Sequence, residues 1–289
     1  MKIWNLTGLL AGMILLVNAA DEMALAATSI KEGNQHTTMT TTADTRSTYT
    51  YDRGGIIRGR LDRKEMALIF TGGSFAEGGE IILDALKQRG IKGSFFFTGD
   101  FFRTPEFKPI IDRVRDEGHY LGPHSDAHPL YASWDNPPKL LISREEFDKD
   151  LDSNMKILKD FGVDPAKAPF FIPPYEHYTQ EISDWTEARG MVLFNFSPGT
   201  RTNADYMEDT HPKYISSEEM VKGVMAKEEK DPAGLNGFMM LIHIGAGPAR
   251  TKDHLYKHMG AMIDELRKRG YSFVRVDELL AKAAPQNNR

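Results

Sequence analysis

The sequence of 289 residues contains no cysteine. Disulfide bonds and thiolate metal sites are therefore excluded, and any bound metal must be held by histidine, aspartate, glutamate or water. The absence also excludes a lipid anchor on an N-terminal cysteine. An excess of positive charge is missing too, because the formal net charge is −5 at pH 7. We therefore expect no nucleic-acid partner, since nothing in the charge balance favours binding to phosphate.

A long hydrophobic run that would span a membrane is missing as well. Residues 6–20 form an apolar stretch, which is too short for a comfortable span. Lys2 precedes this stretch, and small residues in an Ala-x-Ala-like pattern follow it up to Ala26, as in an export signal. We predict a signal peptide over residues 1–26, a secreted or periplasmic protein, and no membrane span after cleavage. A retained N-terminal anchor is the alternative.

Polar residues, threonine above all, fill residues 27–52 without apolar periodicity, which predicts a flexible leader. After this leader, short apolar runs alternate with amphipathic stretches. The predicted strands lie at residues 66–71, 93–98, 119–122, 170–172, 191–196, 238–244 and 271–276. The predicted helices lie at residues 78–89, 105–117, 143–161 and 179–189, with two more beginning at Ser217 and Asp253.

This alternation of strand and helix predicts one α/β domain over residues 53–285. We expect a distorted barrel of about seven parallel strands, with an open doubly wound sheet as the main alternative. In a parallel barrel the chemistry lies at the carboxyl ends of the strands. The residues that follow each predicted strand are therefore the functional candidates.

Two histidines follow the third predicted strand. His124 and His128 stand four residues apart, a spacing that puts two imidazoles on one face of a helical turn and lets them share a metal ion. Neutral histidine is the commonest protein ligand for zinc and its neighbours. The alternative is a pair of surface histidines without a ligand.

Two further strand ends carry polar groups. His243 ends the apolar run of residues 238–242, where it is either a buried structural histidine or a general acid for a leaving amine or alcohol. Pro173 and Pro174 break another strand just before Tyr175. Such a turn can point a backbone N–H at a developing oxyanion, although a rigid structural turn is the simpler alternative.

These three segments, taken in order, resemble the polysaccharide deacetylases, the NodB-homology or carbohydrate esterase family four. The family's His-Ser/Thr-x-x-His metal motif matches residues 124–128, its Pro-Tyr motif matches Pro174 and Tyr175, and its Leu-x-His motif matches residues 241–243. The resemblance covers residues 66–276. It implies a distorted barrel, a divalent metal that is often zinc, and removal of N- or O-acetyl groups from polysaccharides. It also implies that the Tyr175 N–H binds the oxyanion and that His243 is the general acid.

The first motif of that family is altered in this sequence. Members carry Thr-Phe-Asp-Asp-Gly, whereas residues 69–73 read Ile-Phe-Thr-Gly-Gly, so the base and one metal ligand are missing. The arginine that usually orients the base is replaced by Ile172 or Pro173. Glu176 and His177 are further polar candidates beside Tyr175, while Asn203 and Asp205 receive no role.

Two other carboxylates are candidates to compensate. Asp100 follows the second strand and would complete a His-His-Asp metal site with His124 and His128; its alternative role is a helix N-cap. Glu77 lies on the glycine-rich loop after the first strand and would serve as the base. Its alternative role is that of an acidic residue opening a helix.

The leading hypothesis is a hydrolase that depends on a divalent metal, with zinc expected, and removes N- or O-acetyl groups from an extracytoplasmic polysaccharide. The first alternative is a non-catalytic carbohydrate-binding protein on the same fold, suggested by the missing aspartates. A metal-dependent amidohydrolase for a small non-sugar amide is a third possibility. Aromatic residues near the candidate loops suit stacking on sugar rings: Tyr131, Trp134, Tyr175, Tyr178 and Tyr206.

Overall fold

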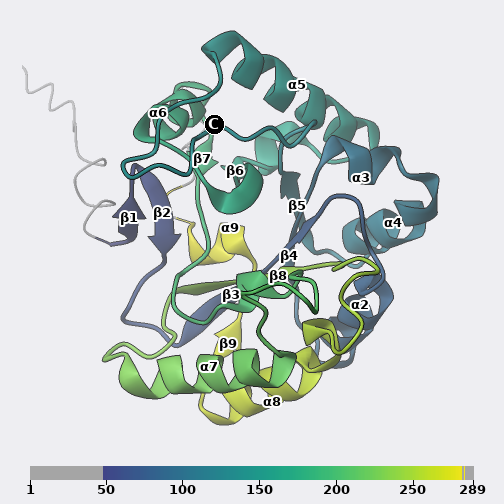
Figure 1. Ribbon diagram of the computed structural model, residues 1–289, viewed down its shortest axis with the longest axis vertical. Helices are drawn as coiled ribbons and strands as arrows, with labels where there is room; N and C mark the ends of the chain where they lie inside the picture. Colours follow the sequence, from purple (N-terminus) through teal and green to yellow (C-terminus); the bar gives the residue numbers. More distant parts are fainter. Residues whose placement is uncertain (1–47, 282, 284–289) are drawn as a thin grey trace, which may run out of the picture. The chain divides into compact units, whose positions relative to one another are not determined.

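The computed structural model describes residues 48–281 and residue 283, and its centre is a sheet of parallel strands (Figure 1). Strand β3 (Glu65–Gly72) lies in the middle, between β4 (Ser94–Phe97) and β8 (Phe238–His243). Strand β5 (Tyr120–Pro123) pairs with β4, and β9 (Ser272–Phe273) pairs with the start of β3. All of these pairings are parallel, as predicted.

Alternate side chains of β3 face two different hydrophobic clusters. Met66, Leu68 and Phe70 belong to one cluster, and Ala67 and Ile69 belong to the other. Because both faces of this strand are covered, the sequence shows a continuous apolar run instead of an alternating pattern. Burial on both faces is typical of a central strand. The carboxyl end of β3 therefore lies between the carboxyl ends of β4 and β8.

A second parallel pair lies beside the main sheet. It consists of β6 (Phe170–Phe171) and β7 (Val192–Leu193). Among the described residues no ladder of hydrogen bonds joins β5 to β6; instead, the Tyr120 hydroxyl accepts a hydrogen bond from the Phe170 N–H at 3.1 Å. Two prolines end β6 after two residues, because proline donates no hydrogen bond to a ladder.

The N-terminal part of the described chain forms a hairpin. Strand β1 (Thr50–Asp52) pairs antiparallel with β2 (Gly55–Arg58), and a single parallel bridge links Ile56 to Phe194 after β7. The leader predicted over residues 27–52 therefore overlaps the fold at β1, which the polar composition did not reveal. Residues 27–47 of that leader and the predicted signal peptide lie outside the described residues.

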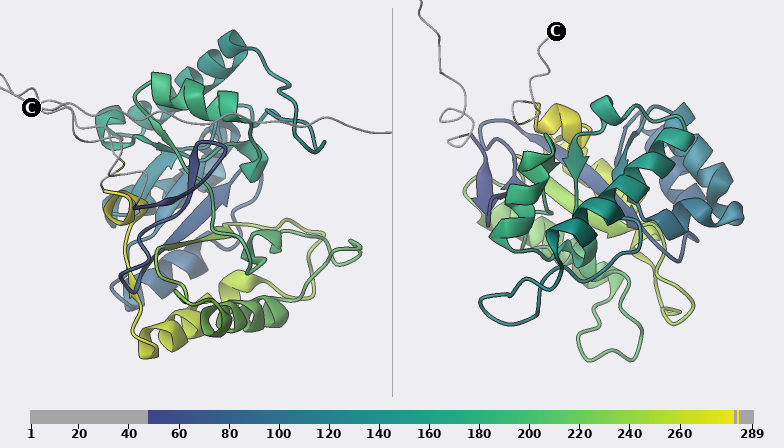
Figure 2. Two further views of the ribbon diagram at one scale, coloured as in Figure 1. Left: turned by 90° about the vertical axis from the view of Figure 1, so that its left-hand side faces the viewer. Right: turned by 90° about the horizontal axis from the view of Figure 1, so that it is seen from above.

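Helices cover the strands on both sides, and short 3₁₀ turns connect them. The helices are α2 (Gly79–Gln88), α3 (Gly99–Arg103), α4 (Lys108–Asp116), α5 (Arg144–Asp160), α6 (Gln180–Ala188), α7 (Ser217–Lys230), α8 (Met259–Lys268) and α9 (Val276–Leu279). The 3₁₀ turns are Pro105–Phe107, Pro165–Lys167, Pro174–Glu176, Thr202–Ala204 and Leu255–Lys257. Helices α7 and α8 lie side by side at the opposite end from α5 and α6 (Figures 1 and 2).

The predicted α/β fold of alternating strands and helices is confirmed, and each of the predicted strands is present. Helix α5 begins at the predicted capping box, in which Ser143 and Glu146 bond each other's backbone N–H. The last long helix, predicted from Asp253, begins only at Met259 after a 3₁₀ turn. Within the described residues the barrel differs from a closed ring at two seams, because no ladder joins β5 to β6 or β7 to β8. No helix among residues 48–281 is long and apolar enough to cross a membrane.

Candidate functional site

The carboxyl ends of the parallel strands gather the predicted site residues. His124 directly follows β5, and His243 is the last residue of β8, where it lies in register with Thr71 of β3. Tyr175 lies in the turn after β6. Residues from distant parts of the sequence therefore share one rim of the sheet, as the barrel rule predicts.

The His124 ring is buried and its orientation is fixed. Its Nδ1 lies 2.9 Å from the carbonyl oxygen of Ile172, and since a carbonyl only accepts, Nδ1 must carry the hydrogen. The lone pair then lies on Nε2, the tautomer that a metal ligand requires. The backbone N–H of His124 donates to Oδ1 of buried Asn154 at 3.0 Å. Backbone and ring are thus both held in place.

His128 approaches His124 through an irregular turn. The ring centroids are 5.0 Å apart with an interplanar angle of 65°. Ser125 and His128 both have positive φ, 68° and 52°, and no helix covers this segment. The expectation of a helical turn is therefore wrong, although the two imidazoles do meet. The Asp150 carboxylate stabilises the turn by accepting hydrogen bonds from two of its backbone N–H groups, at 3.0 and 2.8 Å.

Burial keeps both imidazoles neutral. Desolvation lowers the pKa of His124 well below its ordinary value, and the proximity of His128 and His243 lowers it further. The pKa of His128 falls to about 4 by burial and by the proximity of His243. At neutral pH both rings therefore present lone pairs. His243 thus lies near enough to both rings for its charge to affect their pKa.

His243 forms a dyad with Asp205. Its Nδ1 lies 2.7 Å from Asp205 Oδ1, and its backbone N–H donates to Asp205 Oδ2 at 2.9 Å. Burial lowers the pKa of His243, but the charge of Asp205 and its hydrogen bond outweigh burial, and the pKa is raised overall. The Tyr206 ring packs edge-on at 4.8 Å. Because the carboxylate accepts, Nδ1 carries the hydrogen of this bond, and Nε2 is the atom that gains or loses a proton as the ring titrates.

Tyr175 and Glu176 both adopt left-handed backbone conformations, with φ of 57° and 51°. Such conformations cost on the order of 1–3 kcal/mol each for residues other than glycine and concentrate at functional sites. The buried Asn195 amide donates to the Glu176 carbonyl at 2.7 Å and helps to hold the turn. The Tyr175 ring is half-exposed and lies 4.4 Å from the His128 ring. Sequence alone gave no sign of this strain.

The turn points the Glu176 carboxylate at the histidine pair. Its Oε1 lies 3.9 Å from Nε2 of His124, and only 12% of its side chain is exposed. Burial raises its pKa to about 7, with His243 and Asp205 acting in opposite directions. No side-chain hydrogen bond to this carboxylate occurs within residues 48–281. Glu176, which the sequence offered only as a further polar candidate, therefore lies beside the histidine pair.

The two compensating carboxylates predicted from the sequence have other partners. Asp100 lies in the first turn of α3 with 71% of its side chain exposed and pairs with Arg103 at 2.8 Å. The Glu77 carboxylate accepts hydrogen bonds from the N–H groups of Ala246 and Gly247, at 2.6 and 2.8 Å. The structure does not bring Asp100 to the histidines, and it gives Glu77 the task of holding the loop after β8.

One of the two altered positions of the first motif, Gly72, has no room for a side chain. Thr71 and Gly72 occupy the places of the two aspartates in the matched segment. A Cβ on Gly72 would lie 2.7 Å from Ile244 Cγ2 and 3.0 Å from the Phe101 ring, so no side chain fits there without a shift. The Thr71 hydroxyl is buried and has no hydrogen-bond partner in the described region. The first motif therefore offers no carboxylate to the site.

The donor chemistry fits a small divalent cation. Two neutral imidazoles, one with a fixed Nε2 lone pair, are borderline donors of the kind that zinc prefers. Among the described residues, however, no three His, Asp or Glu side chains already converge at metal-binding distance. His124 and His128 are therefore a two-donor site that needs a third ligand.

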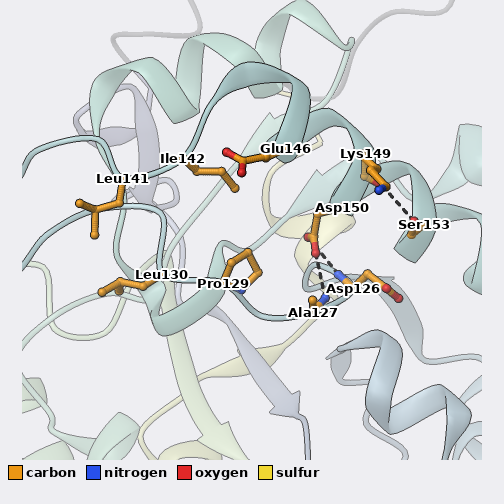
Figure 3. A pocket seen from close by; sticks show the side chains of 10 residues that line it. All are labelled: Asp126, Ala127, Pro129, Leu130, Leu141, Ile142, Glu146, Lys149, Asp150 and Ser153. Carbon is orange, nitrogen blue, oxygen red and sulfur yellow. Dashed lines mark hydrogen bonds between the residues drawn. The ribbon is translucent and has the colours of Figure 1, made fainter.

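A shallow pocket lies next to the histidine turn (Figure 3). Asp126, Ala127, Pro129 and Leu130 line it on one side, and residues of α5 line it on the other. None of the histidines lines this pocket, so its chemistry is separate from that of the histidine cluster. Figure 3 shows Asp150 in the lining of this pocket, where it accepts hydrogen bonds from the backbone N–H groups of Asp126 and Ala127.

The predicted aromatic residues divide into two groups. Tyr131 and Tyr178 are buried in the core, which corrects their assignment as sugar-stacking candidates. Trp134, Tyr175 and Tyr206 have 67%, 47% and 48% of their surface exposed. The Trp134 ring also stacks on the His177 ring at 4.4 Å and an angle of 16°. Three exposed rings thus surround the histidine cluster.

The sequence model of the polysaccharide deacetylase family matches residues 58–194. The chain carries a polysaccharide deacetylase domain. This segment includes the histidine pair and the Pro-Tyr turn, while the His243–Asp205 dyad lies beyond it. The resemblance predicted from the motifs is confirmed.

Curated relatives of this deacetylase domain include bacterial peptidoglycan deacetylases. A peptidoglycan-N-acetylglucosamine deacetylase of Bacillus cereus is 29% identical over 143 residues, 49% of this chain and 47% of the relative. The deacetylase PgdA of Listeria monocytogenes is 26% identical over 222 residues, 75% of this chain and 39% of the relative. The matches thus span less than half the length of both relatives.

Solved structures of carbohydrate esterase family four share the fold of the deacetylase domain. A pseudoenzyme of this family from Bacillus anthracis superposes with a TM-score of 0.62 at 20% identity, covering 80% of this chain and 70% of that one. PdaA from Bacillus subtilis superposes with a TM-score of 0.60 at 21% identity, covering 80% and 86%. At these identities the likeness shows the fold.

Proposed function

We propose that this protein is a metal-dependent hydrolase that removes acetyl groups, N-linked or O-linked, from an extracytoplasmic polysaccharide such as peptidoglycan or chitin. The observation that carries the proposal is the His243–Asp205 dyad beside the His124–His128 pair. A proton donor next to a pair of metal-ligating imidazoles is what amide or ester hydrolysis requires. The names of the curated relatives supply the acetylated glycan as substrate class.

His124 and His128 would hold the divalent cation, for which zinc suits the nitrogen donors. When bound, the cation supplies a water of lowered pKa and polarises the acetyl carbonyl. Tyr175 would donate its backbone N–H to the oxyanion. His243 would give its Nε2 proton to the leaving nitrogen or oxygen as the acyl bond breaks, while Asp205 holds Nδ1 and keeps the ring oriented.

A second candidate function follows from the altered first motif. A non-catalytic carbohydrate-binding protein on the same fold would keep the exposed rings near the histidines and lose only turnover. The similarity to a pseudoenzyme of the family makes this alternative concrete. It differs from the hydrolase proposal in a single measurable property, the release of acetate.

We further propose export of the chain. The basis is the apolar stretch of residues 6–20 with its positively charged start, together with a substrate class that lies outside the cytoplasm. Residues 1–26 would be removed on the way. Comparison of the mass of the secreted protein with that of the full chain tests the cleavage.

The decisive experiment measures acetate released from chitin oligomers, peptidoglycan and acetylated xylan. We expect the wild-type protein to release acetate in the presence of zinc. The His124→Ala variant should release acetate at least about 100-fold more slowly, because it lacks a metal ligand. His211→Ala, which removes an exposed histidine elsewhere, is the matched control. Glycan binding without acetate release by the wild-type protein would favour the second candidate.

A further inference from the structure

We propose that Glu176 is the third ligand of the metal site and replaces the carboxylate that the first motif has lost. The proposal rests on the metal site of the proposed function, since it needs His124 and His128 to bind the same cation. It assigns to a residue of the Pro-Tyr turn a task that the first strand normally performs. No motif of the sequence marks Glu176 for this role.

The position of the carboxylate is the first support. Glu176 Oε1 lies 3.9 Å from His124 Nε2, the atom whose lone pair the Ile172 carbonyl leaves free. Zinc bonds of about 2.0–2.2 Å to nitrogen and oxygen reach across donors up to about 4.2 Å apart. The observed separation lies within that reach. A His-His-Glu set is a known combination at catalytic zinc sites.

The charge balance of the site is the second support. Two neutral imidazoles provide no negative charge, and a divalent cation in a buried site requires compensation. The Glu176 side chain is almost fully buried and has no hydrogen-bond donor within the described part of the chain. A buried carboxylate without a partner is costly in the absence of a cation, and a metal ion at His124 would remove that cost.

The other carboxylates at this rim already form ion pairs or hydrogen bonds. Each one has a close partner in the structure, so none is available without breaking an existing interaction. They are Asp100 and Asp126, which pair with Arg103, Asp150, which bonds the histidine turn, Asp205, which bonds His243, and Glu77, which bonds the loop after β8. Glu176 is the carboxylate of this rim that has no such partner among residues 48–281.

The backbone supplies the third support. Two consecutive residues with φ above 50° are a costly way to build a turn, and the Asn195 amide holds the second of them. The conformation turns the side chain of Glu176 from the sheet edge toward His124. A turn needed only to reverse the chain would place glycine or asparagine at these positions.

The test is a calorimetric titration of zinc chloride into the metal-stripped full chain. We expect Glu176→Gln to weaken zinc binding by at least about 100-fold, because loss of an outer partner of a metal ligand already costs 10–100-fold. Gln keeps the size of the side chain and removes its charge. Glu176→Asp, which keeps the charge on a shorter side chain, should bind with intermediate affinity.

Asp126→Asn is the matched control, because it removes one carboxylate charge from the turn between the two histidines. Its zinc affinity should change by less than about fivefold, as for a charge already paired near the surface. Thermal melting followed by circular dichroism checks that each variant is folded.

Zinc binding by Glu176→Gln as tight as that of the wild-type protein would overturn the role of Glu176 and leave the proposed function standing. Absence of zinc binding by the wild-type protein would remove the site itself, and both proposals with it. Zinc binding that depends on Glu176, without acetate release from any substrate, would overturn only the proposed function.

Discussion

At the residue scale, the candidate site depends on side chains that are oriented by a backbone carbonyl, by a carboxylate or by their own backbone conformation. His124 is aimed by the Ile172 carbonyl, His243 by the Asp205 carboxylate, and Glu176 by its own left-handed conformation. Each of these supports comes from a segment distant in sequence or from a dihedral angle that composition does not encode. They define how single substitutions should act.

The first prediction concerns Asp205. Its charge raises the pKa of His243 against the effect of burial, and a general acid acts only while protonated. Activity should therefore fall as pH rises through the pKa of His243. Asp205→Asn removes the charge, so the alkaline limb of the kcat/KM profile should move to lower pH, with a loss of about 10²–10⁴-fold in kcat. An alkaline limb that stays in place would contradict the assignment of His243.

The second prediction concerns restoration of the first motif. Gly72→Asp should destabilise the protein by about 2–4 kcal/mol, because its Cβ would collide with Ile244 and Phe101 and its charge would be buried. Gly73→Asp is the control, since the nearest atoms, those of Thr98, lie 3.8 Å from a Cβ there. Urea denaturation measures both. Equal stability of the two variants would refute the steric account of the missing aspartate.

Most residues of the candidate site could be predicted from the sequence, because the signals that mark them lie in neighbouring residues. His124, His128, His243 and Tyr175 follow apolar runs that mark strand ends, so their positions on one rim could be inferred. Glu176 and Asp205 could be named but not assigned. Their roles depend on a positive φ and on a contact 38 residues away along the chain, and neither leaves a periodic signal.

At the element scale, helix α5 positions the strand ends that carry the site. Asn154, fully buried on this helix, accepts a hydrogen bond from the His124 N–H at 3.0 Å and donates one to the Phe97 carbonyl at 3.2 Å. One side chain thus fixes the carboxyl ends of both β4 and β5. The capping box at the start of α5 could be predicted, whereas this contact could not.

The third prediction follows from that contact. Asn154→Leu should cost about 1–3 kcal/mol of unfolding free energy, because a buried N–H and a buried carbonyl lose their partner. It should also weaken zinc binding, since His124 loses its backbone support. Ser153→Ala, one position away on the same helix, should change stability by less than about 0.5 kcal/mol. An Asn154→Leu variant as stable as the wild-type protein would show that water takes over the hydrogen bonds of the Asn154 amide.

The elements themselves were largely predictable. Continuous apolar runs marked β3 and β8, because both faces of these strands are covered, and Gly90, Gly118 and Gly190 ended the preceding helices with positive φ. The turn at residues 124–128 was predicted as helical because histidine spacing alone cannot distinguish a helix from a turn held by Asp150. Strand β1 was missed because its residues are polar and partly exposed.

At the scale of the whole described fold, the alternation of strands and helices predicted a parallel α/β architecture. The sequence could not reveal that, within the described residues, the ring of hydrogen bonds is interrupted between β7 and β8 and also between β5 and β6. The interruption between β5 and β6 follows from the prolines after β6, which shorten that strand to two residues. Side chains, among them the ring of His124, bridge the seam instead.

The fourth prediction concerns zinc and thermal stability. Binding to the folded state alone should stabilise the protein by about 2.7 kcal/mol at a free zinc concentration 100 times the dissociation constant. The melting temperature should therefore rise with zinc in the wild-type protein and not in His124→Ala. Differential scanning calorimetry measures both, and an equal rise in the two proteins would place the zinc elsewhere.

The open seam gives the candidate site a mechanical role. His124 directly follows β5 of the large sheet, and Glu176 lies in the turn after β6 of the small sheet. A cation bound to both residues would therefore connect β5 and β6, which no ladder joins. Stripping the metal should then loosen the small sheet first, and amide protons of β6 and β7 should exchange with solvent sooner than those of β3. Catalytic readiness and the integrity of the sheet would thereby be set by the same ion.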